Sequence, residues 1–130
     1  MKEKIFDPLR KKYVALTPEE QVRQMVITWL NRTLGFSLNL MMSEYSFKYN
    51  GLNYRADIVV FNRDMSIKML VECKAPSVKI DSEVIDQGIR YNRVLGVQYI
   101  LFANGISMCG YKRDDISNEY HPIKDVKDIV

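Results

Sequence analysis

Hydrophobic residues in the first third of the chain recur at the spacing of an α-helix. This apolar stripe consists of Val22, Met25, Val26, Trp29 and Leu30. Thr17 and Pro18 form a favoured helix start, as N-cap and first helical residue, and Gly35 is a favoured stop. The sequence therefore predicts an amphipathic helix that begins near Pro18 and ends before Gly35.

The middle of the chain changes to short apolar runs that are typical of strands. We expect four extended segments, at residues 38–42, 45–49, 54–61 and 69–74. Asn50-Gly51 is a favoured two-residue hairpin turn, and the polar residues 62–66 have the composition of a second hairpin loop. The last three of these segments are therefore expected to pair in an antiparallel manner.

Helical spacing returns between Asp81, a polar helix start, and Gly96, a favoured stop. The apolar positions of this second helix are Val84, Ile85, Ile89 and Leu95. The continuous apolar run 97–103 predicts a buried strand, and Asn104-Gly105 turns it into a hairpin that continues to Tyr111. A short helix is expected in the tail, around residues 125–129.

The predicted order of elements is α, β, β, β, α, β, β. A strand, helix and strand in succession, from Val71 to Phe102, predict a right-handed crossover between parallel strands. The three earlier strands form an antiparallel meander. The sequence therefore predicts an α/β fold, in which a mixed β-sheet has a helix on each side and an extra C-terminal hairpin strand.

Charged residues interrupt two strands that otherwise have the composition of a core. Asp57 precedes a run of four apolar residues, and Glu72 and Lys74 close the next run. Because side chains alternate across a strand, Asp57 should share its face with Arg55 and Val59. Glu72 and Lys74 should share a face of the neighbouring strand. Charges are seldom buried unless they are paired or bind a metal, so this arrangement indicates a site.

A simpler interpretation of Glu72 and Lys74 is two solvated side chains on an edge strand. The position of the pair at the end of an apolar run, next to a strand that carries Asp57, favours a functional site instead. Cys73 alternates away from both neighbours and is expected to be a buried thiol on the opposite face.

Composition narrows the class of protein. The 130 residues suffice for one core, and 47% hydrophobic with 27% charged residues is typical of a globular protein. The net charge of +3 permits nucleic-acid binding without arguing strongly for it. No apolar run approaches the roughly 20 residues of a membrane span, and no signal peptide begins the chain. We therefore expect a cytoplasmic protein with no membrane association.

Five short motifs, in this order, resemble the PD-(D/E)-x-K nuclease superfamily, and within it the N-terminal nuclease domain of type I restriction enzyme R subunits. They are Pro18 to Gln24, Arg55 to Val60, Val71 to Pro76, Gln87 to Asn92, and Asn104-Gly105. Ala56 replaces the proline of the superfamily name. The resemblance implies a restriction-endonuclease-like αβββαβ core at residues 17–112, an N-terminal arm at 1–16 and a C-terminal tail at 113–130.

The chain departs from whole R subunits in one respect. The ATP-driven translocase of those proteins needs a phosphate-binding loop, and no Gly-x4-Gly-Lys-[Ser/Thr] motif is present. The resemblance therefore implies a deoxyribonuclease without translocation.

Two carboxylates, Asp57 and Glu72, are the hard oxygen ligands that suit Mg²⁺ or Mn²⁺. The resemblance adds the backbone carbonyl of Cys73 as a third ligand. Lys74 would orient the attacking water and stabilise the negative charge that develops on the phosphate.

Further site residues are expected on the helices. Gln87 and Tyr91 are four residues apart and share a helix face. The resemblance implies that they support the site or contact DNA; the residues alone suggest that Tyr91 belongs to the core and Gln87 to the surface. Arg55 is expected either to touch phosphate or to pair with a carboxylate.

The two adjacent glutamates of the first helix are expected to differ. Glu19 falls at the edge of the apolar stripe and should point toward Asp57, Glu72 and Lys74. Glu20 should point sideways or outward and act in a capping box with Thr17. The simpler alternative is that both only favour the helix N-terminus electrostatically.

Two other classes remain open at this stage, a non-catalytic DNA-binding module and an interaction module with the same fold. The expected partners are DNA and, by resemblance, restriction-modification or helicase subunits. The sequence leaves open whether copies of the chain associate.

Overall fold

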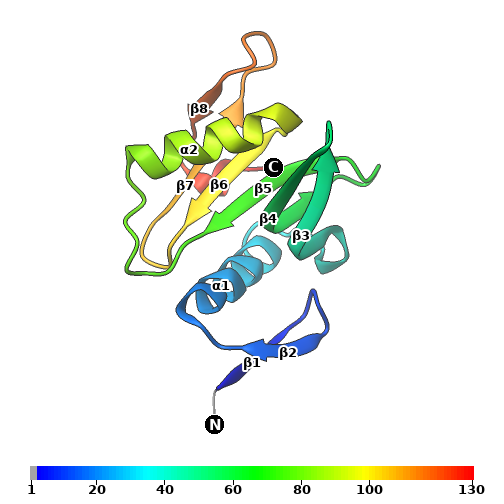
Figure 1. The fold of residues 1–130 in the computed structure, drawn as a ribbon, viewed down its shortest axis with the longest axis vertical. Coiled ribbons are helices and arrows are strands. Elements are labelled where there is room, and N and C mark those ends of the chain that lie inside the picture. The colour runs from blue at the N-terminus through cyan, green and yellow to red at the C-terminus, as the bar shows by residue number, and fades with distance from the viewer. Residues whose placement is uncertain (1–2) are drawn as a thin grey trace.

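The computed structural model describes residues 3–130, and its elements follow the predicted order with additions at both ends (Figure 1). The helices are α1 (Pro18–Arg32) and α2 (Ser82–Asn92), with short 3₁₀ turns η1 (Leu38–Leu40), η2 (Arg93–Leu95) and η3 (Val126–Asp128). The strands are β1 (Lys4–Asp7), β2 (Lys12–Ala15), β3 (Met41–Tyr49), β4 (Leu52–Phe61), β5 (Ile67–Cys73), β6 (Tyr99–Ala103), β7 (Met108–Arg113) and β8 (Tyr120–Pro122).

A six-stranded mixed sheet in the order β3-β4-β5-β6-β7-β8 forms the middle layer of the fold. Its only parallel pair is β5 with β6, the two strands that α2 connects, and the other neighbours are antiparallel. Figure 1 shows α1 and α2 on the two sides of this sheet. The predicted α/β fold with a helix on each face is therefore confirmed.

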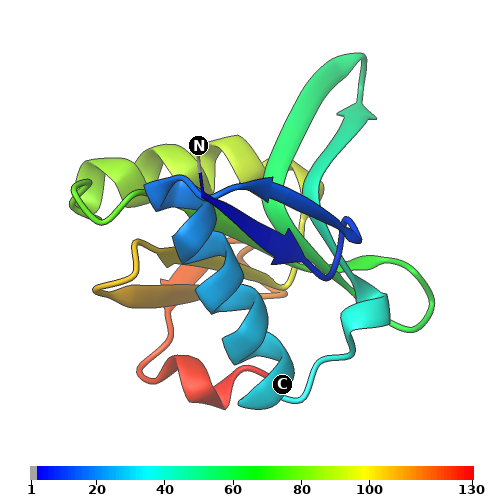
Figure 2. The ribbon, with the colours of Figure 1, turned by 90° about the horizontal axis from the view of Figure 1, so that it is seen from below.

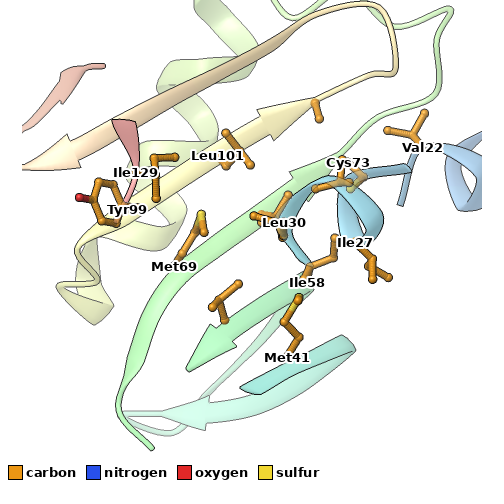
Figure 3. Close-up of a cluster of buried hydrophobic side chains, with 14 residues drawn as sticks. Val22, Ile27, Leu30, Met41, Ile58, Met69, Cys73, Tyr99, Leu101 and Ile129 are labelled. Atoms are coloured by element: carbon orange, nitrogen blue, oxygen red, sulfur yellow. The ribbon is translucent and has the colours of Figure 1, made fainter. Parts of the chain in front are cut away.

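The apolar face of α1 covers one side of the sheet. Figure 3 shows Val22, Ile27 and Leu30 meeting side chains of the central strands. The strand residues of this cluster include Ile58, Met69, Val71, Cys73, Tyr99 and Leu101. As predicted, Cys73 is buried on the face opposite Glu72, and burial raises the pKa of its thiol.

The buried stripe of α1 is rotated from the predicted one. Met25, predicted to face inward, is 51% exposed, whereas Ile27 is 1% exposed and Arg23 is 3% exposed. The helix therefore turns the side of Arg23 and Ile27 toward the sheet. The prediction for Met25 is wrong because the apolar pattern could not show that a charged residue, Arg23, would be buried.

The opposite face of the sheet is covered by α2 through Val84, Ile85 and Ile89, against Val59, Leu70, Ile100 and Phe102. Gly88 lies at the closest approach of this helix. A Cβ atom placed on Gly88 would lie 2.4 Å from Phe102 Cε1 and 3.1 Å from Glu72 Oε2. The absence of a side chain at Gly88 therefore lets the helix approach both the core and the Glu72 carboxylate.

The two ends of the chain differ from the sequence-based expectation. The N-terminal arm contains a hairpin, β1–β2, which lies beside α1 in Figures 1 and 2. The tail adds β8 at the sheet edge, and the short helix expected around 125–129 is the 3₁₀ turn η3. Among residues 3–130, no helix is both long and apolar enough to cross a membrane.

The first half of β4 leaves the body of the sheet. The β4–β5 ladder ends at the pair Ile58–Val71, and residues 52–56 pair only with β3. This part of the β3–β4 hairpin, which turns at Asn50-Gly51 as predicted, projects from the molecule in Figure 2. We call residues 45–56 the arm; this segment is distinct from the N-terminal arm predicted at residues 1–16.

Replacement of Gly88 by alanine should destabilise the protein by about 2 kcal/mol, because the new methyl group overlaps the fully buried ring of Phe102. Urea unfolding measures this change. Asp86→Ala, at an exposed position of the same helix, is the control and should alter stability by no more than about 0.5 kcal/mol. Equal effects of the two substitutions would contradict the close packing at Gly88.

Candidate active site

Asp57 lies at the point where β4 separates from β5. Beyond the pair Ile58–Val71, β5 continues to pair with β6 alone. The N–H of Cys73 instead donates to Asp57 Oδ2, at 2.7 Å. The Asp57 carboxylate therefore accepts a backbone hydrogen bond from β5 at the point where pairing between β4 and β5 has ended.

Strict alternation does not describe the orientation of Asp57. Val59 belongs to the cluster under α2, whereas Asp57 Oδ1 lies 3.3 Å from Nη2 of Arg23, in α1 on the opposite face. The prediction that Asp57 and Val59 share a face is therefore wrong. Opposite Asp57, Glu44 on β3 has a positive φ of 49°, although the β3–β4 register is the same before and after this position.

Glu72 near the carboxyl end of β5 and Lys74 directly after that strand line one cavity of about 390 Å³. The remaining walls come from α2, through Val84, Gln87, Gly88 and Tyr91. The structure thus places Gln87 and Tyr91 beside Glu72 and Lys74, as the resemblance implied. The alternative that Tyr91 belongs to the core is wrong, since this residue is 43% exposed. Asp57 lies one strand away and approaches from the α1 side.

The electrostatics of Glu72 show that the two carboxylates are close enough to interact. Burial raises the pKa of Glu72, and the negative charges of Asp57 and Glu19 raise it further, against the opposing effect of the Lys74 ammonium. Ionisation of Glu72 therefore costs more free energy in this cavity than in water, and a cation bound beside it would offset part of that cost.

The donor set fits a Mg²⁺ ion. Within residues 3–130, no three His, Cys, Asp or Glu side chains gather closely enough to hold a metal by themselves. Mg²⁺ is commonly bound through one or two carboxylates, with water and substrate oxygens completing the shell. Asp57 and Glu72, with the carbonyl of Cys73 directly after Glu72 in the chain, are donors of this kind. The partial burial of Glu72 in its cavity, with the Asp57 charge close enough to act on it, is consistent with a cation at this place.

Tyr91 connects α2 to the arm. Its hydroxyl oxygen accepts the backbone N–H of Arg55 at 3.2 Å. The Arg55 guanidinium pairs with Glu44 at 2.8 Å and is 63% exposed, so the expected pairing with a carboxylate is present. That carboxylate is Glu44 and not a member of the predicted site.

Arg23 is the charged residue that the sequence analysis missed. It is buried in α1, where it donates to Glu20 Oε1 at 2.6 Å and lies 3.3 Å from Asp57 Oδ1. Glu44 Oε1 is 3.5 Å from Arg23 Nη1, the nitrogen that also donates to Glu20. A buried guanidinium is tolerated because carboxylates surround it, and it orients Asp57 from the side opposite Cys73.

The two glutamates of α1 differ in the reverse of the expected way. Glu20 is buried and accepts hydrogen bonds from Arg10, Arg23 and Gln24, so the prediction that it points outward is wrong. Its backbone N–H does donate to Thr17 Oγ1, which confirms the N-cap. Glu19 is 51% exposed, and its nearest charged partner is Arg23 Nη2 at 3.8 Å rather than Lys74.

The N-terminal hairpin completes this group of charges. In the turn between β1 and β2, Arg10 binds Asp7, Glu20 at 2.6 Å and Glu44 at 3.1 Å. Asp7 is fully buried; the hydrogen bonds from Arg10, Ser43 and the Leu9 backbone outweigh the effect of burial and lower its pKa. The only sequence signal for this role is Asp7-Pro8, a turn-forming pair.

Comparison with known families identifies the chain. The family described as type I restriction enzyme R protein N terminus (HSDR_N) matches residues 18–126. The chain belongs to this family. No curated protein sequence matches it.

A solved structure agrees with the fold of this R protein N terminus. It is a fragment assigned to an HsdR subunit of a type I restriction enzyme from Vibrio vulnificus YJ016. The two share 20% sequence identity and a TM-score of 0.56 over 83% of this chain. The chain spans 23% of the length of that fragment, so the similarity concerns one part of a larger protein.

In this R protein N terminus, removal of the Glu20 charge should be far more costly than removal of the Glu19 charge. Glu20→Gln leaves Arg23 and Arg10 without their shared carboxylate and should destabilise the protein by about 3 kcal/mol. Glu19→Gln removes a half-exposed partner and should cost about 0.5 kcal/mol or less. Urea unfolding of both variants compares them directly; equal losses would refute the buried position of Glu20.

Neutralising Glu72 should stabilise the metal-free protein near pH 7. Folding raises the pKa of Glu72 above its ordinary value of 4.5, so the folded state prefers the protonated form and ionisation costs stability above the raised pKa. Glu72→Gln should therefore melt at a higher temperature than the parent in EDTA. The difference should vanish as the pH falls below about 4.5, where Glu72 is protonated in both states. A lower melting temperature near neutral pH would instead indicate a structural ion pair with Lys74.

Proposed function

We propose that this R protein N terminus is a Mg²⁺-dependent deoxyribonuclease domain of the PD-(D/E)-x-K type, which hydrolyses DNA phosphodiester bonds. The observation that carries the proposal is the placement of Glu72 and Lys74 in one cavity, with Asp57 fixed beside them by the N–H of Cys73. Membership of a restriction enzyme family supports the choice of DNA as substrate.

Three oxygen donors would hold the metal: Asp57, Glu72 and the carbonyl of Cys73. Bound Mg²⁺ supplies charge neutralisation at the phosphate and lowers the pKa of coordinated water. The chain keeps Asp57 in place from two sides, by Cys73 and by Arg23, so the carboxylate needs little reorganisation on binding.

Lys74 supplies the positive charge on the wall of the Glu72 cavity. It lies on the same cavity as Glu72, and it is the group that opposes the rise in the pKa of Glu72. In the proposed reaction its ammonium orients the attacking water and stabilises the charge that develops on the phosphate oxygens. Glu19, whose charge reaches Glu72 but whose side chain is half-exposed, would act on the metal through water rather than as a direct ligand.

Around this centre, Gln87 and Tyr91 would position the DNA strand or the cavity wall, and the exposed Arg55 would meet phosphate. Restriction-modification subunits are the proposed protein partners.

Lys74→Ala should lower the rate of DNA cleavage by at least about 100-fold, since it removes a donor aimed at the developing charge. The assay incubates supercoiled, linear and single-stranded DNA with the protein and Mg²⁺ or Mn²⁺, and EDTA should stop cleavage of all three. Lys124→Ala, an exposed lysine of the tail, is the matched control and should cut like the parent. Intact DNA in every condition, or full activity of Lys74→Ala, would favour a non-catalytic DNA-binding module.

A further inference from the structure

The N-terminal hairpin reaches toward the candidate site through the side chain of Arg10. Its guanidinium presents a different nitrogen to each of three carboxylates: Nε binds Asp7, Nη2 donates to Glu20 at 2.6 Å, and Nη1 lies 3.1 Å from Glu44. Asp7 belongs to the hairpin and is fully buried. The guanidinium is therefore anchored in its own hairpin while its two terminal nitrogens contact α1 and β3.

Glu20 connects Arg10 to Arg23. The Oε1 atom of Glu20 accepts from Arg10 Nη2 and from Arg23 Nη1, both at 2.6 Å, while Oε2 accepts from Gln24 at 3.0 Å. The residue is only 5% exposed, so solvent can do little to replace a lost partner. Two guanidinium groups thus share one buried carboxylate, and each limits the position of the other.

The bond from Arg23 to Asp57 is the longest hydrogen bond of this series. Arg23 Nη2 lies 3.3 Å from Asp57 Oδ1, whereas Nη1 lies 2.6 Å from Glu20. Among residues 3–130, the buried Nε atom of Arg23 finds no hydrogen-bond partner. The guanidinium is thus located by its two terminal nitrogens, and a displacement of Nη1 also moves Nη2.

Without Arg10, two carboxylates would compete for Nη1 of Arg23. Glu20 would keep Arg23 as its one guanidinium partner, and Glu44 Oε1 already lies 3.5 Å from the same nitrogen. Opposite charges attract more strongly where water is excluded, so Arg23, which is 3% exposed, would be drawn toward both. Because the bond to Asp57 is the longer one, it is the bond expected to open.

We propose that Arg10 is a positioning residue of the candidate metal site, which holds the Asp57 carboxylate in its orientation through Glu20 and Arg23. This role rests on the proposed function, in which Asp57 is a metal ligand. Loss of an outer partner that orients a ligand commonly weakens metal binding by about 10- to 100-fold. Family similarity begins at residue 18, so the positioning residue lies in a segment that precedes the recognisable motifs.

Amide hydrogen exchange in EDTA tests the positioning without metal or cleavage. The N–H of Cys73 donates to Asp57 at 2.7 Å, and the adjacent N–H of Lys74 donates to the Ala103 carbonyl oxygen at 2.8 Å. Arg10→Ala should accelerate exchange at Cys73 by at least about 10-fold more than at Lys74, as expected when one charge-assisted hydrogen bond is loosened. General destabilisation accelerates both amides alike, so equal acceleration would overturn the proposal.

Metal affinity, measured by isothermal titration with Mn²⁺, separates positioning from a simple charge effect. Removal of a positive charge near a cation site should by itself tighten Mn²⁺ binding. Lys12→Ala, at an exposed position of the same hairpin, measures that effect and should bind at least as tightly as the parent. Arg10→Ala should instead bind about 10-fold more weakly than the parent. Affinity equal to or higher than that of Lys12→Ala would overturn the proposal.

Arg10→Lys keeps the charge and is the second variant if Arg10→Ala does not fold. A single ammonium cannot present three separate nitrogens to three carboxylates, so this variant should show the same two changes. Parent-like exchange and affinity would overturn the role of Arg10 and leave the nuclease standing. Selective acceleration at Cys73, in a protein whose parent binds no Mn²⁺, would support the hold of Arg10 on Asp57 and refute the metal site.

Discussion

The buried guanidinium of Arg23 is the constraint on which the geometry of the site depends. A charge in that position is costly unless carboxylates meet it, and Glu20, Glu44 and Asp57 do so from α1, β3 and β4. Through Glu20 the N-terminal hairpin joins the same group. One cation therefore fixes how four separate segments approach each other, and Asp57 acquires its orientation as part of that arrangement.

The separation of β4 from β5 divides the site between the two faces of the sheet. Asp57 is held from the α1 side, in a group of fixed ion pairs, while Glu72 opens toward the cavity under α2. One carboxylate is therefore preorganised and the other is buried at an electrostatic cost. The same separation leaves the arm paired with no strand but its own partner, and Tyr54 of the arm contacts Tyr91 of α2 at 5.0 Å between ring centroids.

Local signals in the sequence predicted most of the fold. Thr17 as N-cap, the turn at Asn50-Gly51 and the parallel pairing of β5 with β6 all follow from short-range rules, and all are present. Alternation also placed Glu72 and Lys74 together. It failed at Asp57, which lies beyond the last β4–β5 pair and is held instead by the N–H of Cys73 and by Arg23. Helical periodicity failed for Glu20 because the stripe was defined by apolar residues that include the exposed Met25. The buried side of α1 also contains Arg23, the partner of Glu20, which no apolar pattern can reveal.

The N-terminal hairpin has a consequence for the extent of the folded unit. Sequence similarity to the family begins at residue 18, yet Asp7 and Arg10 precede it and are bonded to Ser43, Glu20 and Glu44. A fragment cut at the similarity boundary would retain every side chain around the cavity but expose Glu20 to solvent and leave it with one guanidinium fewer. The folded unit thus extends beyond the region of sequence similarity, because Arg10 of its first segment forms ion pairs with Asp7 and Glu20.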